Sequence, residues 1–144
     1  MEAESHLDVL SDEACRHLLS NEQVGRVAFV DAAGYPVVLP VNYVVDGDFI
    51  VFRTDPGAKF DLVPLRRVAF EVEHLAPACR SGWSVLVQGL GQDLTDAVGS
   101  AFEQLRRRHV DLWAPGDKAH WLAVEIHHIS GRRIRPRDER YPSF

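Results

Sequence analysis

The sequence is poor in residues that build metal sites and in motifs that mark common enzymes. Its two cysteines, Cys15 and Cys79, stand far apart and belong to no metal-ligand spacing, and the histidines show none either. It has no nucleophile elbow, no Walker loop and no G-x-G-x-x-G fingerprint. No Ser, Cys or carboxylate pair stands out as catalytic. We therefore predict reduced thiols, no bound metal and no catalytic side chain.

An excess of positive charge and a long apolar segment are also lacking. The first ten residues, MEAESHLDVL, contain neither a basic region nor a long apolar run, so we expect no signal peptide and a cytoplasmic protein. The formal net charge of -5 gives no general attraction to nucleic acid or anionic lipid, so we expect neither partner. Basic residues gather around 106–108 and 132–140, where solvated charge is the simpler interpretation and a local anion or partner patch the alternative.

What is present suits one domain with an apolar core. The chain has 144 residues, 46% hydrophobic and 26% charged, without a repeat, a low-complexity stretch or a dividing linker. A domain of this size can bury a core without disulfides or metals. We predict a single domain over 1–144, with a loose polar tail at 135–144.

The first half of the chain predicts a short helix followed by a β-meander. Ser11 is a suitable N-cap for the helix. Residues 24–45 are largely β-branched or aromatic and are broken at 31–34, which predicts two strands joined by a tight loop. Asp46-Gly47 favours a type I′ turn before a third strand at 49–52.

The second half of the chain predicts three more strands. They are expected at 68–72, 83–90 and 121–126, with helices at 58–65 and 97–108 and a loop at 75–82. Helical crossovers between the early strands are missing, which disfavours a parallel sheet. We predict a mainly β fold, a six-stranded antiparallel barrel that is closed or half-closed and carries short helices.

Two neighbouring histidines, His127 and His128, follow the last predicted strand. Adjacent side chains of a regular strand point to opposite faces. We therefore predict that these two imidazoles do not act as a pair.

One strand-to-helix corner has the composition of a phosphate site. Arg53 and Thr54 end the predicted third strand, Gly57 allows a turn, and Lys59 falls in the first turn of the next helix. Free N–H groups at a helix N-terminus favour an anion, and two cations with a hydroxyl match a phosphate monoester. The alternative is a plain corner with solvated charges, and the pattern alone leaves both open.

Two strands carry polar side chains on a face that could meet a ligand. Pro40 removes a ladder donor in mid-strand, and Asn42 shares its face, so an amide lies among apolar neighbours. Either a neighbouring backbone satisfies that amide or a flat polar ligand lies across the strand. In the fifth strand, Ser84 and Gln88 share one face and Trp83 lies on the other. The polar face is either half-exposed or offers hydrogen bonds to a ligand or a second subunit.

Taken in order, these segments resemble a known family. They are Gly25-Arg26-Val27-Ala28, Pro40-Val41-Asn42-Tyr43, Phe52-Arg53-Thr54 with Gly57 and Lys59, Val68-Ala69-Phe70-Glu71-Val72 and Gly82-Trp83-Ser84-Val85-Leu86-Val87-Gln88-Gly89. From about residue 10 to about residue 134 the chain resembles the pyridoxamine 5′-phosphate oxidase-related proteins of the FMN-binding split-barrel class, in their short actinobacterial form. Order and spacing carry this resemblance, since no single motif is very specific.

The resemblance implies a split β-barrel that forms a homodimer and holds FMN at the subunit interface. It places the flavin phosphate at Arg53, Thr54 and Lys59. It places the flavin ring against Pro40, Val41, Asn42 and Tyr43, with Trp83, Ser84 and Gln88 contributed by the partner subunit and Trp113 as a further cover.

The implied function is an FMN-dependent oxidoreductase acting on a small-molecule substrate, with the flavin supplying the redox chemistry. The chain lacks the C-terminal substrate-binding segment of true pyridoxamine phosphate oxidases, and the basic tail at 132–137 does not replace it, so we do not expect vitamin B6 oxidation. A reductase using the deazaflavin F420 is an alternative, favoured if Arg26 or Arg80 lines the groove. Another is a non-catalytic flavin- or haem-binding dimer, with His74 or His128 as the axial candidates.

Overall fold

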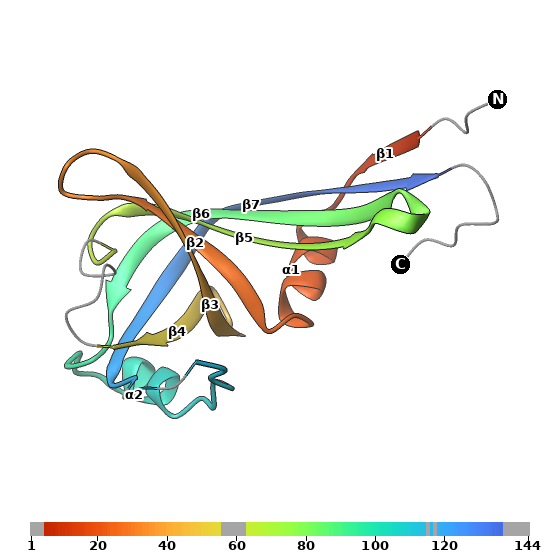
Figure 1. Ribbon diagram of the computed structural model, residues 1–144. Coiled ribbons are helices and arrows are strands. Elements are labelled where there is room, and N and C mark those ends of the chain that lie inside the picture. The colour runs from red at the N-terminus through yellow and green to blue at the C-terminus, as the bar shows by residue number, and fades with distance from the viewer. Residues whose placement is uncertain (1–4, 56–62, 115, 117, 137–144) are drawn as a thin grey trace.

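The computed structural model describes residues 5–55, 63–114, 116 and 118–136, and it begins with a strand and a capped helix (Figure 1). The strand β1 runs over Ser5–Val9 and the helix α1 over Asp12–Ser20. Ser11 caps α1 as predicted, because its Oγ accepts a hydrogen bond from the backbone N–H of Ala14 at 3.1 Å.

Six further strands and a second helix follow. The strands are β2 (Val24–Val30), β3 (Pro36–Asp46), β4 (Phe49–Thr54), β5 (Arg67–Ala76), β6 (Ser81–Asp93) and β7 (His120–Pro136). A 3-10 turn, η2 (Pro77–Cys79), joins β5 to β6, and the helix α2 is Ser100–Arg106. The predicted meander of β2, β3 and β4 is confirmed. The helix predicted at 58–65 falls mainly outside the described residues.

All paired strands are antiparallel, and six of them close a ring. The hydrogen-bonded order runs β7-β4-β3-β2-β5-β6 and returns from β6 to β7. This arrangement confirms the predicted six-stranded antiparallel split β-barrel. A seventh strand, β1, was not predicted. It pairs with the last part of β7 outside the ring.

The strands β5, β6 and β7 extend beyond the ring as a long ribbon, with β1 along its edge (Figure 1). The predicted loop at 75–82 is shorter than expected: residues 77–80 form the turn, but β5 continues to Ala76 and β6 starts at Ser81. The predicted loose tail is wrong for residues 135–136, which pair with β1. In both places, hydrogen bonding to a neighbouring strand outweighs the turn-favouring and polar composition of the segment.

Apolar side chains from the strands of the ring fill the barrel. Those with no exposed surface include Val27, Ile50, Phe52, Phe70, Val85, Val87, Leu122 and Val124. A second, smaller core lies against α2 and includes Val51 and Ala123 from the opposite side of β4 and β7. Because successive side chains of a strand alternate, the residues between the barrel-filling ones form an outer sheet face.

Candidate ligand-binding face

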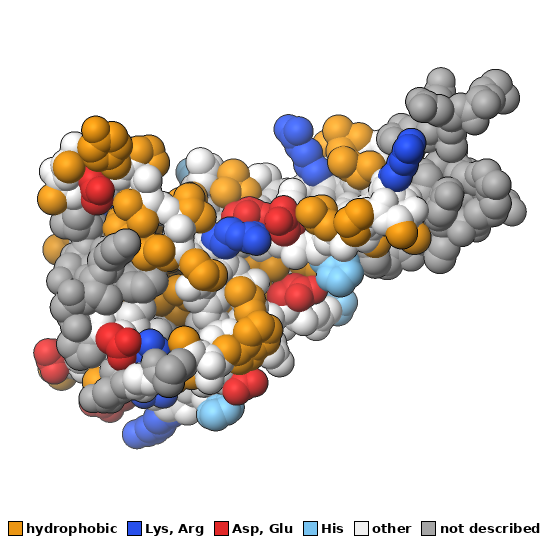
Figure 2. All heavy atoms as spheres, viewed as in Figure 1, with side chains coloured by type: hydrophobic (Ala, Val, Ile, Leu, Met, Phe, Trp, Pro, Cys, Tyr) orange, Lys and Arg blue, Asp and Glu red, His pale blue; other side chains and the backbone are white. Residues whose placement is uncertain are grey.

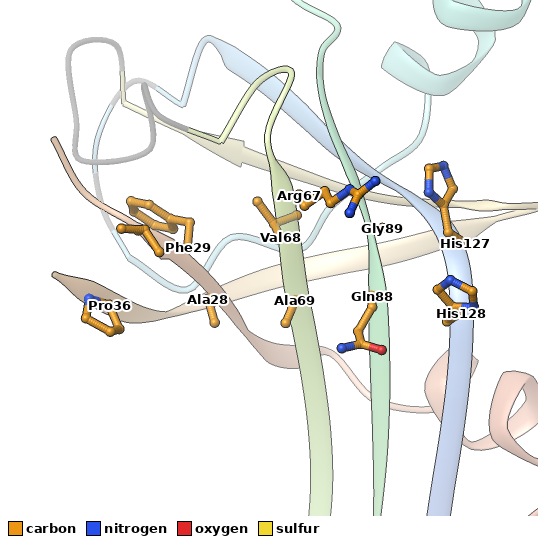
Figure 3. A pocket seen from close by; sticks show the side chains of 11 residues that line it. Ala28, Phe29, Pro36, Arg67, Val68, Ala69, Gln88, Gly89, His127 and His128 are labelled. Carbon is orange, nitrogen blue, oxygen red and sulfur yellow. The ribbon is translucent and has the colours of Figure 1, made fainter. Parts of the chain in front are cut away.

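Two of the hollows on the described surface bear on the predicted site. The Arg67 hollow, of about 540 Å³, is lined by residues of β2, β3, β5, β6 and β7 (Figure 3). The Arg26 hollow, of about 610 Å³, is lined by the start of β2, by Pro40 of β3, by β5 and by Trp113. Gln88 lines only the first hollow and Pro40 only the second. One protomer therefore does not bring these two predicted site residues together.

In the Arg26 hollow, the arginine is paired with carboxylates. The Nη1 atom of Arg26 lies 3.4 Å from Glu73 Oε1 and 3.7 Å from Glu71 Oε2. Burial, with the repulsion of the Glu73 carboxylate, raises the pKa of Glu71 above its ordinary value. At the same end of β5, His74 lies 3.7 Å from Glu22. The arginine of this hollow is thus already engaged by carboxylates.

Asn42 holds the segment that carries Trp113. Its Oδ1 accepts the backbone N–H of Trp113 at 2.9 Å, and its Nδ2 donates to the Gln23 carbonyl at 3.5 Å. Of the two alternatives that the sequence left open, the structure shows that neighbouring backbone satisfies this amide. The Trp113 side chain is 66% exposed and lines the Arg26 hollow with Pro40. The structure therefore brings Pro40, Asn42 and Trp113 together.

Two other predicted ring contacts, Val41 and Tyr43, are buried in the barrel core. They are 8% and 4% exposed. The Tyr43 hydroxyl donates to the Leu19 carbonyl, and its ring packs edge-on against Phe70. Burial raises the pKa of Tyr43 well above its ordinary value. Only the backbone of these two residues is available to a ligand on the outer face.

Arg53 and Thr54, the predicted phosphate ligands, have separate surroundings. The guanidinium of Arg53 lies 4.7 Å from the centre of the Trp121 ring, and its Nε donates to the Lys118 carbonyl at 2.8 Å. Thr54 is 3% exposed, and its Oγ1 is buried without a hydrogen-bond partner among the described residues. Adjacent strand residues point to opposite faces, which separates the two side chains. The third predicted phosphate ligand, Lys59, lies outside the described residues.

The polar and apolar faces of β6 alternate as predicted. Trp83 is 5% exposed and stacks on His74, with 6.4 Å between the ring centres and 18° between the ring planes. Ser84 is half-buried and Gln88 is exposed. The Trp83 indole therefore belongs to the packing of its own protomer, while Ser84 and Gln88 face outward.

A β-bulge lies at His127 and His128, so the regular alternation on which our prediction for these two imidazoles rested does not hold there. Gln88 of β6 pairs with His128, but the next residue of β6 pairs with Ile126. His127 is therefore an extra residue in β7, and an extra residue interrupts the alternation of side chains. Both imidazoles line the Arg67 hollow (Figure 3).

Gly89 is the sequence feature that marks this bulge. A Cβ atom at Gly89 would lie 1.8 Å from the backbone oxygen of Glu125, so the two strands approach closely only because the side chain is missing. A single glycine inside a strand is typical of a bulge or of close backbone contact.

Metal clusters and membrane-spanning helices are both absent from the described part of the chain. No group of three or more His, Cys, Asp or Glu residues in that part is placed to hold a metal ion. None of its helices is long and apolar enough to cross a membrane.

Comparison with known proteins decides the family. The family described as pyridoxamine 5′-phosphate oxidase matches residues 11–133, most of the chain. The chain belongs to this family. The resemblance that we drew from the sequence is therefore confirmed.

The chain is also similar to individual proteins and solved structures. The chain is 34% identical over 131 residues to Rv0080, an uncharacterised protein of Mycobacterium tuberculosis, covering 85% of this chain and 82% of the relative. The fold of this chain matches that of the FAD-binding protein from Mycobacterium smegmatis with a TM-score of 0.72 and 30% identity, over 88% of this chain and 97% of the other. The FAD- and heme-binding protein from the same organism matches with a TM-score of 0.64 and 19% identity, over 96% and 76%, which shows a shared fold.

Proposed function

We propose that this protein is a flavin-dependent oxidoreductase that binds FMN between two copies of the chain and acts on a small-molecule substrate. The observation that carries the proposal is the Arg26 hollow, where an exposed indole, Trp113, is held beside Pro40 by the Asn42 amide. An aromatic side chain on a backbone held in place, next to a proline that leaves no N–H of its own to satisfy, suits one side of a flat ring.

The buried hydroxyl of Thr54 supports a phosphate nearby. A buried polar atom without a partner is costly, so a ligand that accepts its hydrogen bond is favoured. A flavin phosphate supplies such an acceptor, and Lys59 would add the opposite charge. Arg53, in contrast, is engaged by Trp121 and by the Lys118 carbonyl, so we assign it to holding the loop at 118 beside β4.

The need for a second subunit follows from where the outward residues of β6 lie. Ser84 and Gln88 face away from their own barrel, and Gln88 lines a different hollow from Pro40. They reach a ring at Pro40 only from a partner. Hydrophobic side chains gather on the exposed surface of the ribbon (Figure 2). Leu75, Leu86 and Ile134 are among the exposed ones, and they suit a surface that a second copy covers.

When bound, the flavin supplies the redox chemistry. The residues of this chain orient it and shield it: Asn42 fixes the position of Trp113, and Thr54 offers a hydrogen bond to the phosphate. The pairing of Arg26 with Glu71 and Glu73 favours FMN over F420, because this arginine is not free for the long acidic tail of F420. Arg80 lies at the turn between β5 and β6 and does not line the Arg26 hollow, so it is no substitute.

The test is an absorbance spectrum of the purified protein, followed by titration with FMN, FAD and F420. We expect a flavin spectrum, and FMN binding that weakens about tenfold or more in Lys59→Ala. Arg107→Ala, which removes an exposed cation after α2, is the matched control and should bind FMN as the wild type does. Sedimentation of the protein should show a dimer.

Other outcomes would replace parts of the proposal. Preference for FAD would change the cofactor, as would preference for F420. A Soret band would favour haem, for which His128 in the Arg67 hollow is the available axial ligand. A colourless protein that binds none of these ligands would refute the proposal.

A further inference from the structure

We propose that the Arg67 hollow is a binding site for a small organic anion with a flat apolar body. Within one protomer this site is distinct from the hollow that contains Pro40 and Trp113, although its Gln88 is also a proposed contact to the flavin held by the partner. The inference does not require that flavin binds. It rests on the charge, the hydrogen-bond donors and the apolar wall of the hollow itself.

The cation in this hollow is free. Arg67 is exposed at the start of β5, and within the described ranges its guanidinium makes no hydrogen bond and no ion pair. None of the described residues that line the hollow is acidic, although the whole chain carries 21 acidic residues against 16 lysines and arginines. An unpaired guanidinium in a concave surface favours a carboxylate, which it binds through two parallel N–H donors.

Other side chains that can donate hydrogen bonds line the same hollow as the Arg67 guanidinium. Gln88 and the two imidazoles of His127 and His128 line the same hollow, and Figure 3 shows Arg67 extending from β5 towards β6. Among the described residues, Glu125 is the one carboxylate in contact with any of these groups: it lies 3.7 Å from His127 and accepts a hydrogen bond from Gln92 at 3.1 Å. The described polar groups in the hollow are therefore donors, or can act as donors, towards an anion.

The remaining wall of the hollow is apolar. It includes Ala28, Phe29 and Val68, with Pro36 at one side (Figure 3). Burying a flat hydrocarbon against such a wall is favourable in proportion to the area removed from water. A mixture of an apolar wall and a few convergent polar groups is typical of sites for small organic molecules rather than for inorganic ions.

The β-bulge lies at the edge of this hollow. The extra residue in β7 interrupts the alternation at His127 and His128, and both imidazoles line the hollow. Gly89, which also lines it, permits the close approach of β6 and β7. The hollow therefore receives two imidazoles from β7, beside Gln88 of β6 and Arg67 of β5.

The probe is 2-naphthoate, titrated calorimetrically into the purified full chain, once as isolated and once saturated with FMN. Arg67→Gln is the test variant. Arg66→Gln removes the neighbouring exposed arginine, which does not line the hollow, and is the matched control. We expect wild-type binding to weaken about tenfold or more in Arg67→Gln and to stay within about twofold in Arg66→Gln. Two partial probes, acetate and 2-naphthylmethanol, should both bind more weakly than 2-naphthoate.

Location is checked by NMR. The imidazole proton signals of His127 and His128, assigned through His127→Gln and His128→Gln, should shift when 2-naphthoate is added, and those of the exposed His109 should not. The inference is wrong if 2-naphthoate fails to bind at millimolar concentration, or if both arginine variants weaken binding equally. It is also wrong if 2-naphthylmethanol binds as tightly as 2-naphthoate. Binding of 2-naphthoate without any flavin binding would support this site and refute the proposed function, and the reverse result would do the opposite.

Discussion

The Arg67 hollow and the Arg26 hollow have similar sizes and lie on the same sheet, and each contains one arginine from a strand. Arg26 lies within 3.7 Å of two carboxylates, whereas Arg67 has no such partner in the described part of the chain. The Arg67 hollow also contains two imidazoles at a bulge, and the Arg26 hollow contains an exposed indole. An arginine therefore favours an anionic ligand only where no carboxylate of the protein already forms an ion pair with it.

A substitution at Gly89, beside the bulge, should have a large effect on stability. Gly89→Ala would put a Cβ atom 1.8 Å from the Glu125 backbone oxygen, and neither strand can move away without losing its pairing. We expect a loss of unfolding free energy on the order of 3 kcal/mol or more, measured by thermal or urea unfolding. Gly47→Ala is the control, because that glycine has a φ of 57° and open space around it, and should cost only about 1 kcal/mol. Equal losses in the two variants would contradict this account of the bulge.

The Arg26 hollow can be altered through Asn42. Asn42→Ala removes the hydrogen bonds to the Trp113 N–H and to the Gln23 carbonyl, and should lower the unfolding free energy by about 1 kcal/mol. Trp113 fluorescence should become less anisotropic, measured in a background where Trp83 and Trp121 are replaced by Phe. Asn42→Asp keeps the acceptor for the Trp113 N–H, so it should retain most of the anisotropy. If both variants behave alike, the Trp113 segment is not held by this oxygen.

The difference in charge pairing can be reversed by substitution. The double variant Glu71→Gln with Glu73→Gln should leave Arg26 without its carboxylate partners, and the Arg26 hollow should then resemble the Arg67 hollow. We expect acetate or 2-naphthoate to bind there about two- to fivefold more tightly than in the wild type, measured in an Arg67→Gln background. Adding Arg26→Gln should remove the gain, and a gain that persists without Arg26 would show that another group binds the anion.

The smallest expected effect concerns the single variant Glu71→Gln and its pH dependence. Because burial raises the pKa of Glu71 in the folded protein, the folded state binds this proton more readily than the unfolded state does. The stability of the wild type should therefore rise as pH falls from neutral towards the ordinary value of a glutamate. Glu71→Gln should raise the Tm at neutral pH by on the order of 1 °C, and the difference should shrink as the pH is lowered. A difference that is constant with pH would mean that ionisation of Glu71 is not its cause.

Much of the fold could be predicted because its signals are local. The cap at Ser11, the turn at Asp46-Gly47 and the β-branched run of residues 24–45 each specify nearby backbone, and the structure has the helix, the turn and the strands there. The alternation of β6, with Trp83 inward and Gln88 outward, also follows from a period of two residues.

The candidate site was harder to predict because it depends on partners distant in sequence. The sequence placed Asn42 beside Pro40, but not the backbone of Trp113, 71 residues away, that occupies its amide oxygen. Arg53 looks like a phosphate ligand by composition, yet Trp121 and the Lys118 carbonyl engage it across the β4–β7 pair. Such pairings are fixed by strand register, which no short motif encodes.

The class of this protein follows from its sequence alone: an antiparallel barrel of the pyridoxamine 5′-phosphate oxidase family, with a polar outward face on β6. Which charges on the sheet are paired follows only from the assembled fold. A strand's own residues set which side chains share a face, but the neighbouring strand sets what lies opposite each one. For that reason Arg26 faces Glu71 across β2 and β5, and although Gly89 indicates a bulge, only the pairing of β6 with β7 identifies His127 as its extra residue.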